Sequence, residues 1–139
     1  MTKAIPLGGA RFKDKWGTPD VIGIQESGRS DIMKIPVEIV SAEIKTNTRE
    51  LITAFGQTCA YCLFNHKCYL VVPSQSEKVD LSRLDSLCQV FGIGLVLFDS
   101  KSQDDSRFEI RVRPRKQEPD IDWTNKYMKI KGVESELFP

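Results

Sequence analysis

Two helical segments, each placed between strand-like segments, constrain the fold of this chain more than any other feature. Segments 50–66 and 80–91 carry apolar residues at helical spacing, and the second ends at Gly92. Buried-strand patterns follow them, "CYLVVP" at 68–73 and "GIGLVLFD" at 92–99. Strands joined through a helix run parallel in one sheet. The chain is therefore expected to form a sheet with parallel central strands.

Three further segments complete the expected sheet. The run "DVIGI" at 20–24 and the alternating run "IPVEIVSAEIKT" at 35–46 predict an antiparallel pair. The run "RFEIRVR" at 107–113 is typical of a half-exposed edge strand. Residues 1–18 are rich in Pro and Gly and predict a loop or a short irregular strand. The predicted fold class is α/β (mixed α+β), a central mixed β-sheet flanked by helices.

The first helical segment predicts two distinct faces. One is an apolar stripe formed by Ile52, Phe55, Cys59 and Cys62. Gln57 and Tyr61, four residues apart, share another face. In the strand before this helix, Val40, Ala42 and Ile44 are expected on one side and Ser41, Glu43 and Lys45 on the other.

Length and composition limit the class of protein. With 139 residues, 40% of them hydrophobic and 28% charged, the chain is expected to fold around one core. We expect a single domain over 1–113, with 114–139 as a C-terminal tail that is either a packed extension, through Trp123, Tyr127 and Met128, or a linker. There is no apolar run long enough for a membrane span and no signal-peptide pattern. We therefore expect a cytoplasmic protein with reduced cysteines.

Two carboxylates are expected to converge at one end of the predicted antiparallel pair. Asp20 opens the first of these strands and Glu43 lies near the end of the second. Two carboxylates form a hard-oxygen site suited to Mg²⁺, to which the backbone carbonyl of Ile44 adds a third ligand. Lys45, on the same face as Glu43, would lie where a cation stabilises charge developing on a phosphate. Hydrolysis of a phosphodiester bond requires this set of groups.

These residues resemble the motifs of the PD-(D/E)XK nuclease superfamily, also called restriction-endonuclease-like. Pro19-Asp20 matches the "PD" half, Glu43-Ile44-Lys45 the "ExK" half, and Gln57 to Tyr61 the QxxxY motif of RecB-like members. The resemblance covers roughly residues 10–98. It implies a restriction-endonuclease-like core, metal ligation by Asp20 and Glu43, and a catalytic Lys45. It also implies a supporting catalytic role for Gln57 and Tyr61, with Mg²⁺ or Mn²⁺ as cofactor and DNA as substrate.

The chain departs from the family pattern at its beginning. Members usually have a helix before the first core strand, and residues 1–18 do not predict one. The chain is then a fragment, or the helix is lost, or its place is taken by the tail, a partner domain or a second subunit in a homodimer. Each alternative puts full activity in question.

A local excess of positive charge predicts where nucleic acid would bind. Between Arg107 and Lys131 there are eight Lys or Arg residues against four acidic ones. Four of them are expected to follow the phosphate backbone: Arg111, Arg113, Arg115 and Lys116. A solvated sheet edge is an equally good interpretation of this charge run, and RNA stays open as a substrate.

The leading hypothesis is a divalent-metal-dependent endonuclease of the restriction, repair or recombination type. One alternative is a non-catalytic nucleic-acid-binding or assembly module with a nuclease-like fold. Another is an unrelated mixed α/β domain, in which Glu43 and Lys45 belong to an ordinary charged strand surface. A zinc site formed by Cys59, Cys62, His66 and Cys68 is disfavoured, because the first two lie on the expected apolar stripe.

Overall fold

The computed structural model describes residues 2–7, 11–12, 15–99 and 107–139. Its strands are β1 (Thr2–Pro6), β2 (Val21–Gln25), β3 (Glu38–Ile44), β4 (Lys67–Pro73), β5 (Gly94–Phe98) and β6 (Phe108–Val112). Its helices are α1 (Leu51–Tyr61), α2 (Lys78–Phe91), α3 (Ile121–Met128) and α4 (Val133–Leu137).

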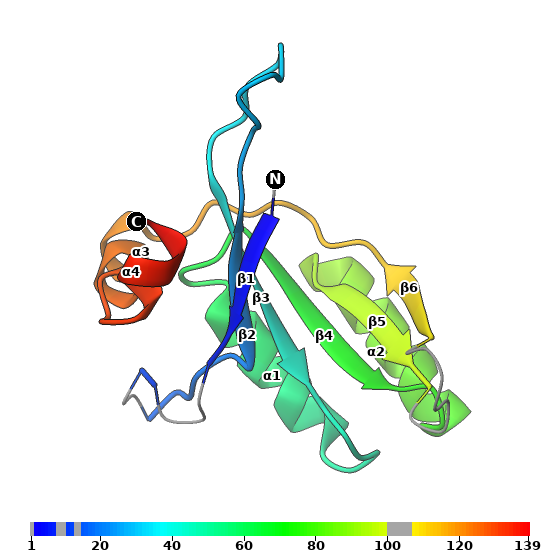
Figure 1. Ribbon diagram of the computed structural model, residues 1–139. Coiled ribbons are helices and arrows are strands. Elements are labelled where there is room, and N and C mark those ends of the chain that lie inside the picture. The colour runs from blue at the N-terminus through cyan, green and yellow to red at the C-terminus, as the bar shows by residue number, and fades with distance from the viewer. Residues whose placement is uncertain (1, 8–10, 13–14, 100–106) are drawn as a thin grey trace.

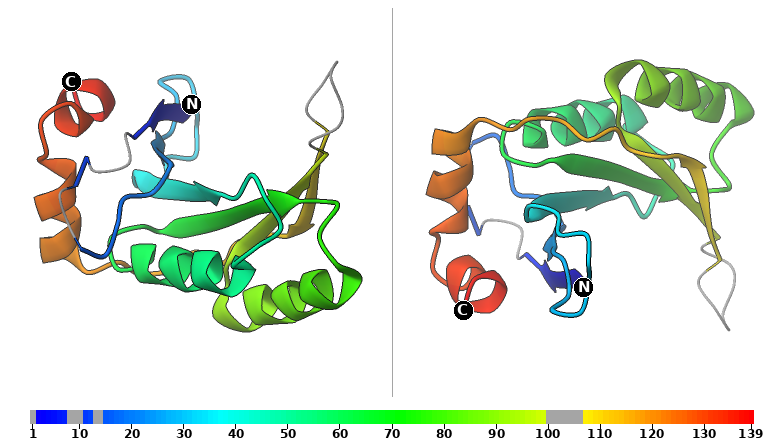
Figure 2. Two further views of the ribbon diagram at one scale, coloured as in Figure 1. Left: turned by 90° about the horizontal axis from the view of Figure 1, so that it is seen from below. Right: turned by 90° about the horizontal axis from the view of Figure 1, so that it is seen from above.

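The six strands form one mixed sheet in the order β1-β2-β3-β4-β5-β6 (Figure 1). The pairs β1–β2, β2–β3 and β5–β6 are antiparallel, whereas β3–β4 and β4–β5 are parallel. Helices α1 and α2 make the two parallel crossovers and lie on the same face of the sheet (Figure 2). The prediction of a mixed α/β fold with a mixed sheet flanked by helices is therefore confirmed at this level.

The N-terminal segment is more regular than the sequence predicted. Residues Thr2–Pro6 form a complete edge strand that pairs with all of β2, Thr2 opposite Gln25 and Pro6 opposite Val21. Pro6 is the last residue of this strand, at the outer edge of the sheet, where a missing N–H costs no ladder hydrogen bond. Pro6 therefore closes the strand, and the glycines of this segment follow the strand in the sequence.

The predicted apolar stripe of the first helix is wrong in its position. Ile52 is 66% exposed, and Cys59 and Cys62 are only partly buried. The residues that face the sheet are Leu51, Ala54, Phe55, Thr58 and Tyr61. This rotation brings Tyr61 onto the covered face of the sheet and leaves Gln57 exposed, so these two residues do not share one environment.

The second helix and the strands around it follow the prediction closely. Leu84 and Cys88 are the buried residues of α2, and Leu81 and Leu87 pack beside them. Gly92 ends the helix with φ of +72°, a backbone conformation that a residue without Cβ adopts without strain. Strand β5 follows as a buried strand and β6 as the sheet edge.

The C-terminal segment packs against the rest of the molecule. Tyr127 and Met128 of α3 and Val133 and Leu137 of α4 are buried in the same apolar cluster as Phe12. The two helices lie beside β1 and do not cover the sheet face opposite α1 and α2 (Figures 1 and 2). Among the described residues, there is no helix of the length and apolar character needed to cross a membrane.

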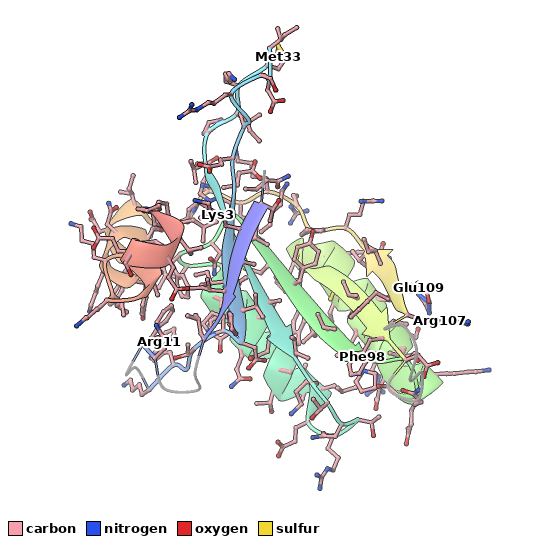
Figure 3. The ribbon with its side chains drawn as sticks, in the orientation of Figure 1. Lys3, Arg11, Met33, Phe98, Arg107 and Glu109 are labelled. Carbon is pink, nitrogen blue, oxygen red and sulfur yellow. The ribbon has the colours of Figure 1, made fainter. Side chains whose placement is uncertain are left out.

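The connection between β2 and β3 projects as an arm from the body of the molecule. Met33 lies near the far end of this arm (Figure 3). Within the arm, Ser27 and Ile35 are joined by a hydrogen bond from the Ile35 N–H to Ser27 Oγ (2.6 Å). Asp20 directly precedes β2, which begins at Val21 and runs toward the arm. The arm therefore leaves the sheet at the end opposite to Asp20.

Candidate functional site

Asp20 and Glu43 meet where β2 begins and β3 ends. Strand β2 pairs with β3 so that Val21 lies opposite Ala42, which places Asp20 directly before the pair and Glu43 directly after it. Oδ2 of Asp20 accepts a hydrogen bond from the backbone N–H of Ile44 (2.7 Å). The backbone of β3 therefore fixes the Asp20 carboxylate beside Glu43.

The polar residues of β3 lie on the covered side of the sheet. Ser41 and Glu43 are buried, Glu43 with only 8% of its surface exposed, whereas Val40, Ala42 and Ile44 lie on the side without helices and are more exposed. The predicted alternation along this strand is confirmed. Its polar face, however, is the one that α1 covers, which is unusual because a buried charge normally costs stability.

The pKa of Glu43 reflects this burial. Desolvation, followed by the negative charge of Asp20 and a hydrogen bond with it, raises the pKa of Glu43 to about 8. The charge of Lys45 and a hydrogen bond with Tyr61 act in the opposite direction but do not compensate. Glu43 therefore favours its protonated form at neutral pH.

Tyr61 completes the covered side of the site. Its side chain is buried and makes a hydrogen bond with Glu43. Burial and the charges of Glu43 and Asp20 raise its pKa, so the phenol stays protonated and donates to the carboxylate. Gly17, with φ of +91°, passes so close that a Cβ there would lie 3.2 Å from the Tyr61 hydroxyl. The segment that leads to Asp20 therefore rests on Tyr61.

Lys45 and Gln57 lie at the rim of the site. Lys45 follows β3 directly, is half-buried, and its backbone N–H donates to the carbonyl of Val71 (2.9 Å). Its charge is near enough to lower the pKa of Glu43. Gln57 is exposed one turn before Tyr61 and makes no side-chain hydrogen bond within the part of the chain that the structure describes. Of the five predicted catalytic residues, Asp20, Glu43 and Tyr61 interact directly, Lys45 acts on Glu43 through its charge, and Gln57 has no interaction with the carboxylates.

The backbone carbonyl of Ile44 is available on the Asp20 side. In a strand, the N–H and C=O of one residue point to the same neighbour, and the Ile44 N–H points to Asp20. Continuing the β2–β3 register places Pro19 opposite Ile44, and proline has no N–H to donate. Pro19 therefore provides no N–H that could pair with the Ile44 carbonyl.

The donor set suits a hard divalent cation that keeps part of its water shell. Two carboxylates and one carbonyl provide oxygen atoms, the ligands that Mg²⁺ and Mn²⁺ prefer. No group of three or more His, Cys, Asp or Glu side chains suited to a metal occurs among the described residues. An ion held by Asp20, Glu43 and the Ile44 carbonyl would need further ligands from outside the described residues.

Asn65 is a supporting residue that the sequence did not indicate. It is completely buried, and its Nδ2 donates to the Tyr61 carbonyl (2.8 Å) and to Ser41 Oγ (3.0 Å). These bonds tie the end of α1 to β3, the strand that carries Glu43. The only advance signal was Ser41, a polar residue on the same strand face as Glu43.

The four basic residues predicted to bind nucleic acid lie elsewhere. Arg111 pairs with Asp85 and Glu109 (both 3.7 Å), and Arg115 donates to the Val90 carbonyl at the end of α2 (3.3 Å). Arg113 is exposed just past β6.

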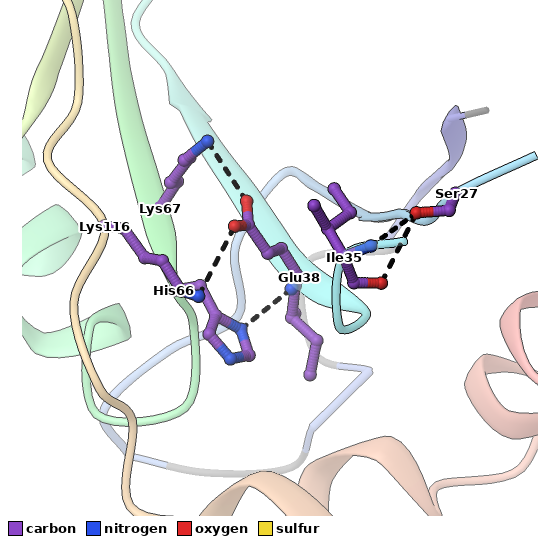
Figure 4. Close-up of polar contacts among 7 residues, drawn as sticks. Ser27, Ile35, Glu38, His66, Lys67 and Lys116 are labelled. Atoms are coloured by element: carbon purple, nitrogen blue, oxygen red, sulfur yellow. Dashed lines mark hydrogen bonds and ion pairs between the residues drawn. The ribbon is translucent and has the colours of Figure 1, made fainter. Parts of the chain in front are cut away.

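Lys116 pairs with Glu38 (3.6 Å), at the opposite end of β3 from Glu43 (Figure 4). The two glutamates are five positions apart along the strand, roughly 16 Å. These four basic residues therefore do not surround the carboxylates of Asp20 and Glu43.

The cysteines and His66 lie near one another but serve separate contacts. Cys62 Sγ and Cys68 Sγ are 3.1 Å apart, and all four cysteines are free thiols. His66 Nδ1 accepts a hydrogen bond from the Ile39 N–H (2.9 Å), so the ring serves as a cap for β3 (Figure 4).

Comparison of the chain with models of protein families, with curated proteins and with solved structures finds no match.

Proposed function

We propose that the protein is a divalent-metal-dependent nuclease that hydrolyses phosphodiester bonds, with DNA as its substrate. The observation that carries this proposal is the carboxyl pair formed by the half-buried Asp20 and the buried Glu43. Lys67 and Lys116 neutralise Glu38, another buried acid of β3, but Glu43 lies against a second acid and has a pKa of about 8. A carboxyl group whose ionised form is unfavourable unless a cation lies nearby, as here for Glu43, is typical of a functional site.

The order of elements supports a restriction-endonuclease-like core. An antiparallel pair, β2 and β3, precedes helix α1, and the parallel strands β4 and β5 follow. The motifs "PD", "ExK" and QxxxY fall on the start of β2, the end of β3 and helix α1, which is where the resemblance requires them.

Each residue has a role that follows from its position. Asp20, Glu43 and the Ile44 carbonyl would hold Mg²⁺ or Mn²⁺, which when bound supplies Lewis-acid stabilisation of a phosphate. Lys45, at the rim, would orient the attacking water and stabilise negative charge on the phosphate. Tyr61 orients the Glu43 carboxylate through its hydrogen bond. Gln57, which is exposed, would contact the nucleic acid instead of the ion.

The direct test is incubation of supercoiled plasmid and of single-stranded DNA with the purified protein in EDTA, Mg²⁺ or Mn²⁺. We expect cleavage only with a metal, and loss of cleavage in Lys45→Ala. Lys78→Ala is a matched control, because Lys78 is an exposed lysine at the start of α2. Intact DNA under every condition would contradict the proposal and favour a non-catalytic nucleic-acid-binding module. Equal loss in both variants would remove Lys45 from the mechanism.

A further inference from the structure

An aromatic hollow lies at the C-terminal end of α1, the helix that carries Tyr61. Its volume is about 630 Å³. Two tryptophans line it, Trp16 on the segment before β2 and Trp123 on α3, together with Tyr127. These are the only two tryptophans of the chain, although they are more than 100 positions apart in sequence. Hollows of this size hold small organic groups.

Both tryptophans present surface to solvent. Trp16 is 61% exposed and Trp123 is 40% exposed. Trp123 stacks on Tyr127 with 5.9 Å between ring centroids and 27° between ring planes. Large aromatic side chains of soluble proteins are usually covered, so two of them in one hollow indicate a surface that receives a planar or apolar group.

The hollow and the candidate site share two chain segments. Trp16 is followed by Gly17, which rests on the Tyr61 hydroxyl, and Asp20 comes four positions after Trp16. That segment spans at most about 14 Å. On the other side, Cys59 and Ala60 of α1 line the hollow directly before Tyr61.

Charge around the hollow favours an anionic occupant. Lys15 belongs to its lining, and Nζ of Lys126 lies 4.5 Å from the centroid of the Trp123 ring. Among the described residues that line the hollow, none is acidic. Asp122 precedes Trp123 on α3 but is not part of the lining. Aromatic faces bordered by cations are the surfaces on which the bases of single-stranded nucleic acids stack.

We infer that this hollow is a base-stacking platform for an unpaired nucleotide next to the phosphate held at the carboxyl pair. The inference deepens the proposed function and rests on it. It narrows the substrate to a nucleic acid with a single-stranded segment at the cleavage position. In duplex DNA the bases are paired and stacked on one another, so they cannot enter the hollow.

The two tryptophans provide the test, because all tryptophan emission comes from the hollow. The protein is titrated in EDTA with a short oligothymidylate and, separately, with a duplex of the same length. We expect the single strand to quench the emission at lower concentration than the duplex. In anisotropy measurements with a labelled oligothymidylate, Trp16→Ala and Trp123→Ala should each weaken binding about ten-fold. Phe108→Ala is the control, since Phe108 is 62% exposed on the distant edge strand β6.

The outcomes separate this inference from the nuclease itself, since binding is measured without metal. Unchanged emission with the single strand, or unchanged affinity in both tryptophan variants, would overturn the platform even where metal-dependent cleavage is observed. Quenching by a polyproline peptide but not by the oligonucleotide would also overturn it, in favour of a peptide groove. Quenching by the single strand without any cleavage would support the platform while the nuclease proposal fails.

Discussion

The two glutamates of β3 have the same burial and opposite electrostatics. Glu38 and Glu43 are each 8% exposed. Burial by itself would raise the pKa of Glu38. The pKa is nevertheless below its usual value, because Lys67 donates a hydrogen bond and the charges of Lys67, Lys116 and His66 lie nearby (Figure 4). At the other end of the strand, the pKa of Glu43 rises to about 8 beside Asp20. Desolvation raises the pKa of both acids, and what offsets it differs: basic partners surround Glu38, whereas a second acid lies beside Glu43.

The largest expected difference between the two glutamates is in cleavage. Glu43→Gln removes a metal-ligating oxygen and should lower metal-dependent cleavage by at least about 100-fold, which corresponds to ~2.7 kcal/mol. Glu38→Gln should stay within a few-fold of the parent protein, because Glu38 lies at the far end of the strand. Cleavage rates of the two variants on plasmid DNA with Mg²⁺ test these expectations. Equal losses of cleavage in both variants would show that Glu43 and Glu38 do not differ in function.

The pH dependence of stability should show the raised pKa of Glu43. The folded protein keeps a proton that the unfolded chain releases near pH 4.5, so the contribution of Glu43 to stability is complete below that pH. It is lost as pH rises through about 8, by about 2 kcal/mol after allowance for solvent screening.

Urea denaturation at several pH values between 5 and 8 measures this loss. Glu43→Gln has no proton to release and should flatten the decline, whereas Glu38→Gln should leave it unchanged. A decline of the same slope in Glu43→Gln would show that another group causes it.

Added metal should stabilise the protein through the site that contains Glu43 and not through Glu38. At about ten times its dissociation constant, Mg²⁺ or Mn²⁺ should raise the free energy of unfolding by about 1.4 kcal/mol, a few degrees in Tm. The rise should disappear in Glu43→Gln and persist in Glu38→Gln. Thermal unfolding with and without metal measures it, and an equal rise in all three proteins would place the ion elsewhere.

The smallest expected effects concern the partners of Glu38. Lys67 lies 3.0 Å from it and is better shielded from solvent than Lys116, which lies at 3.6 Å. Lys67→Ala should therefore destabilise the protein by about 1 kcal/mol, and Lys116→Ala by about 0.5 kcal/mol or less. Both losses should vanish at a pH below the lowered pKa of Glu38, where that acid is protonated. Chemical denaturation at neutral and acidic pH tests this, and pH-independent losses would mean that packing causes them.

Much of the fold was predictable because its signals are local. Alternation in β3 and the glycine stop of α2 each depend on a few neighbouring residues, and both predictions are confirmed. The face that α1 turns to the sheet was not predictable in the same way. More than one face of this helix carries apolar residues. The face that packs on β3 and β4 is the one with Phe55 and Tyr61.

The site was predictable only in part, for a related reason. Asp20 and Glu43 come together through one strand pair, whose register follows from the alternation of β2 and β3. The neutralisation of Glu38 depends on Lys67 and Lys116, and the aromatic hollow depends on Trp16 and Trp123. These residues are distant in sequence, and no periodic pattern connects them. For the same reason the charge run could not show that Arg111, Arg113, Arg115 and Lys116 lie away from the carboxyl pair; their binding of nucleic acid stays a prediction.

The most direct test of the account is a carboxyl ¹³C NMR titration of the glutamates, with and without Mg²⁺. We predict that Glu43 titrates near pH 8 in the absence of metal and that Mg²⁺ moves its titration to much lower pH, because the ion replaces the proton. Glu38 should titrate below pH 4.5 under both conditions. A Glu43 that titrates at its ordinary value, or one that does not respond to Mg²⁺, would contradict the claim that this carboxyl pair is a metal site.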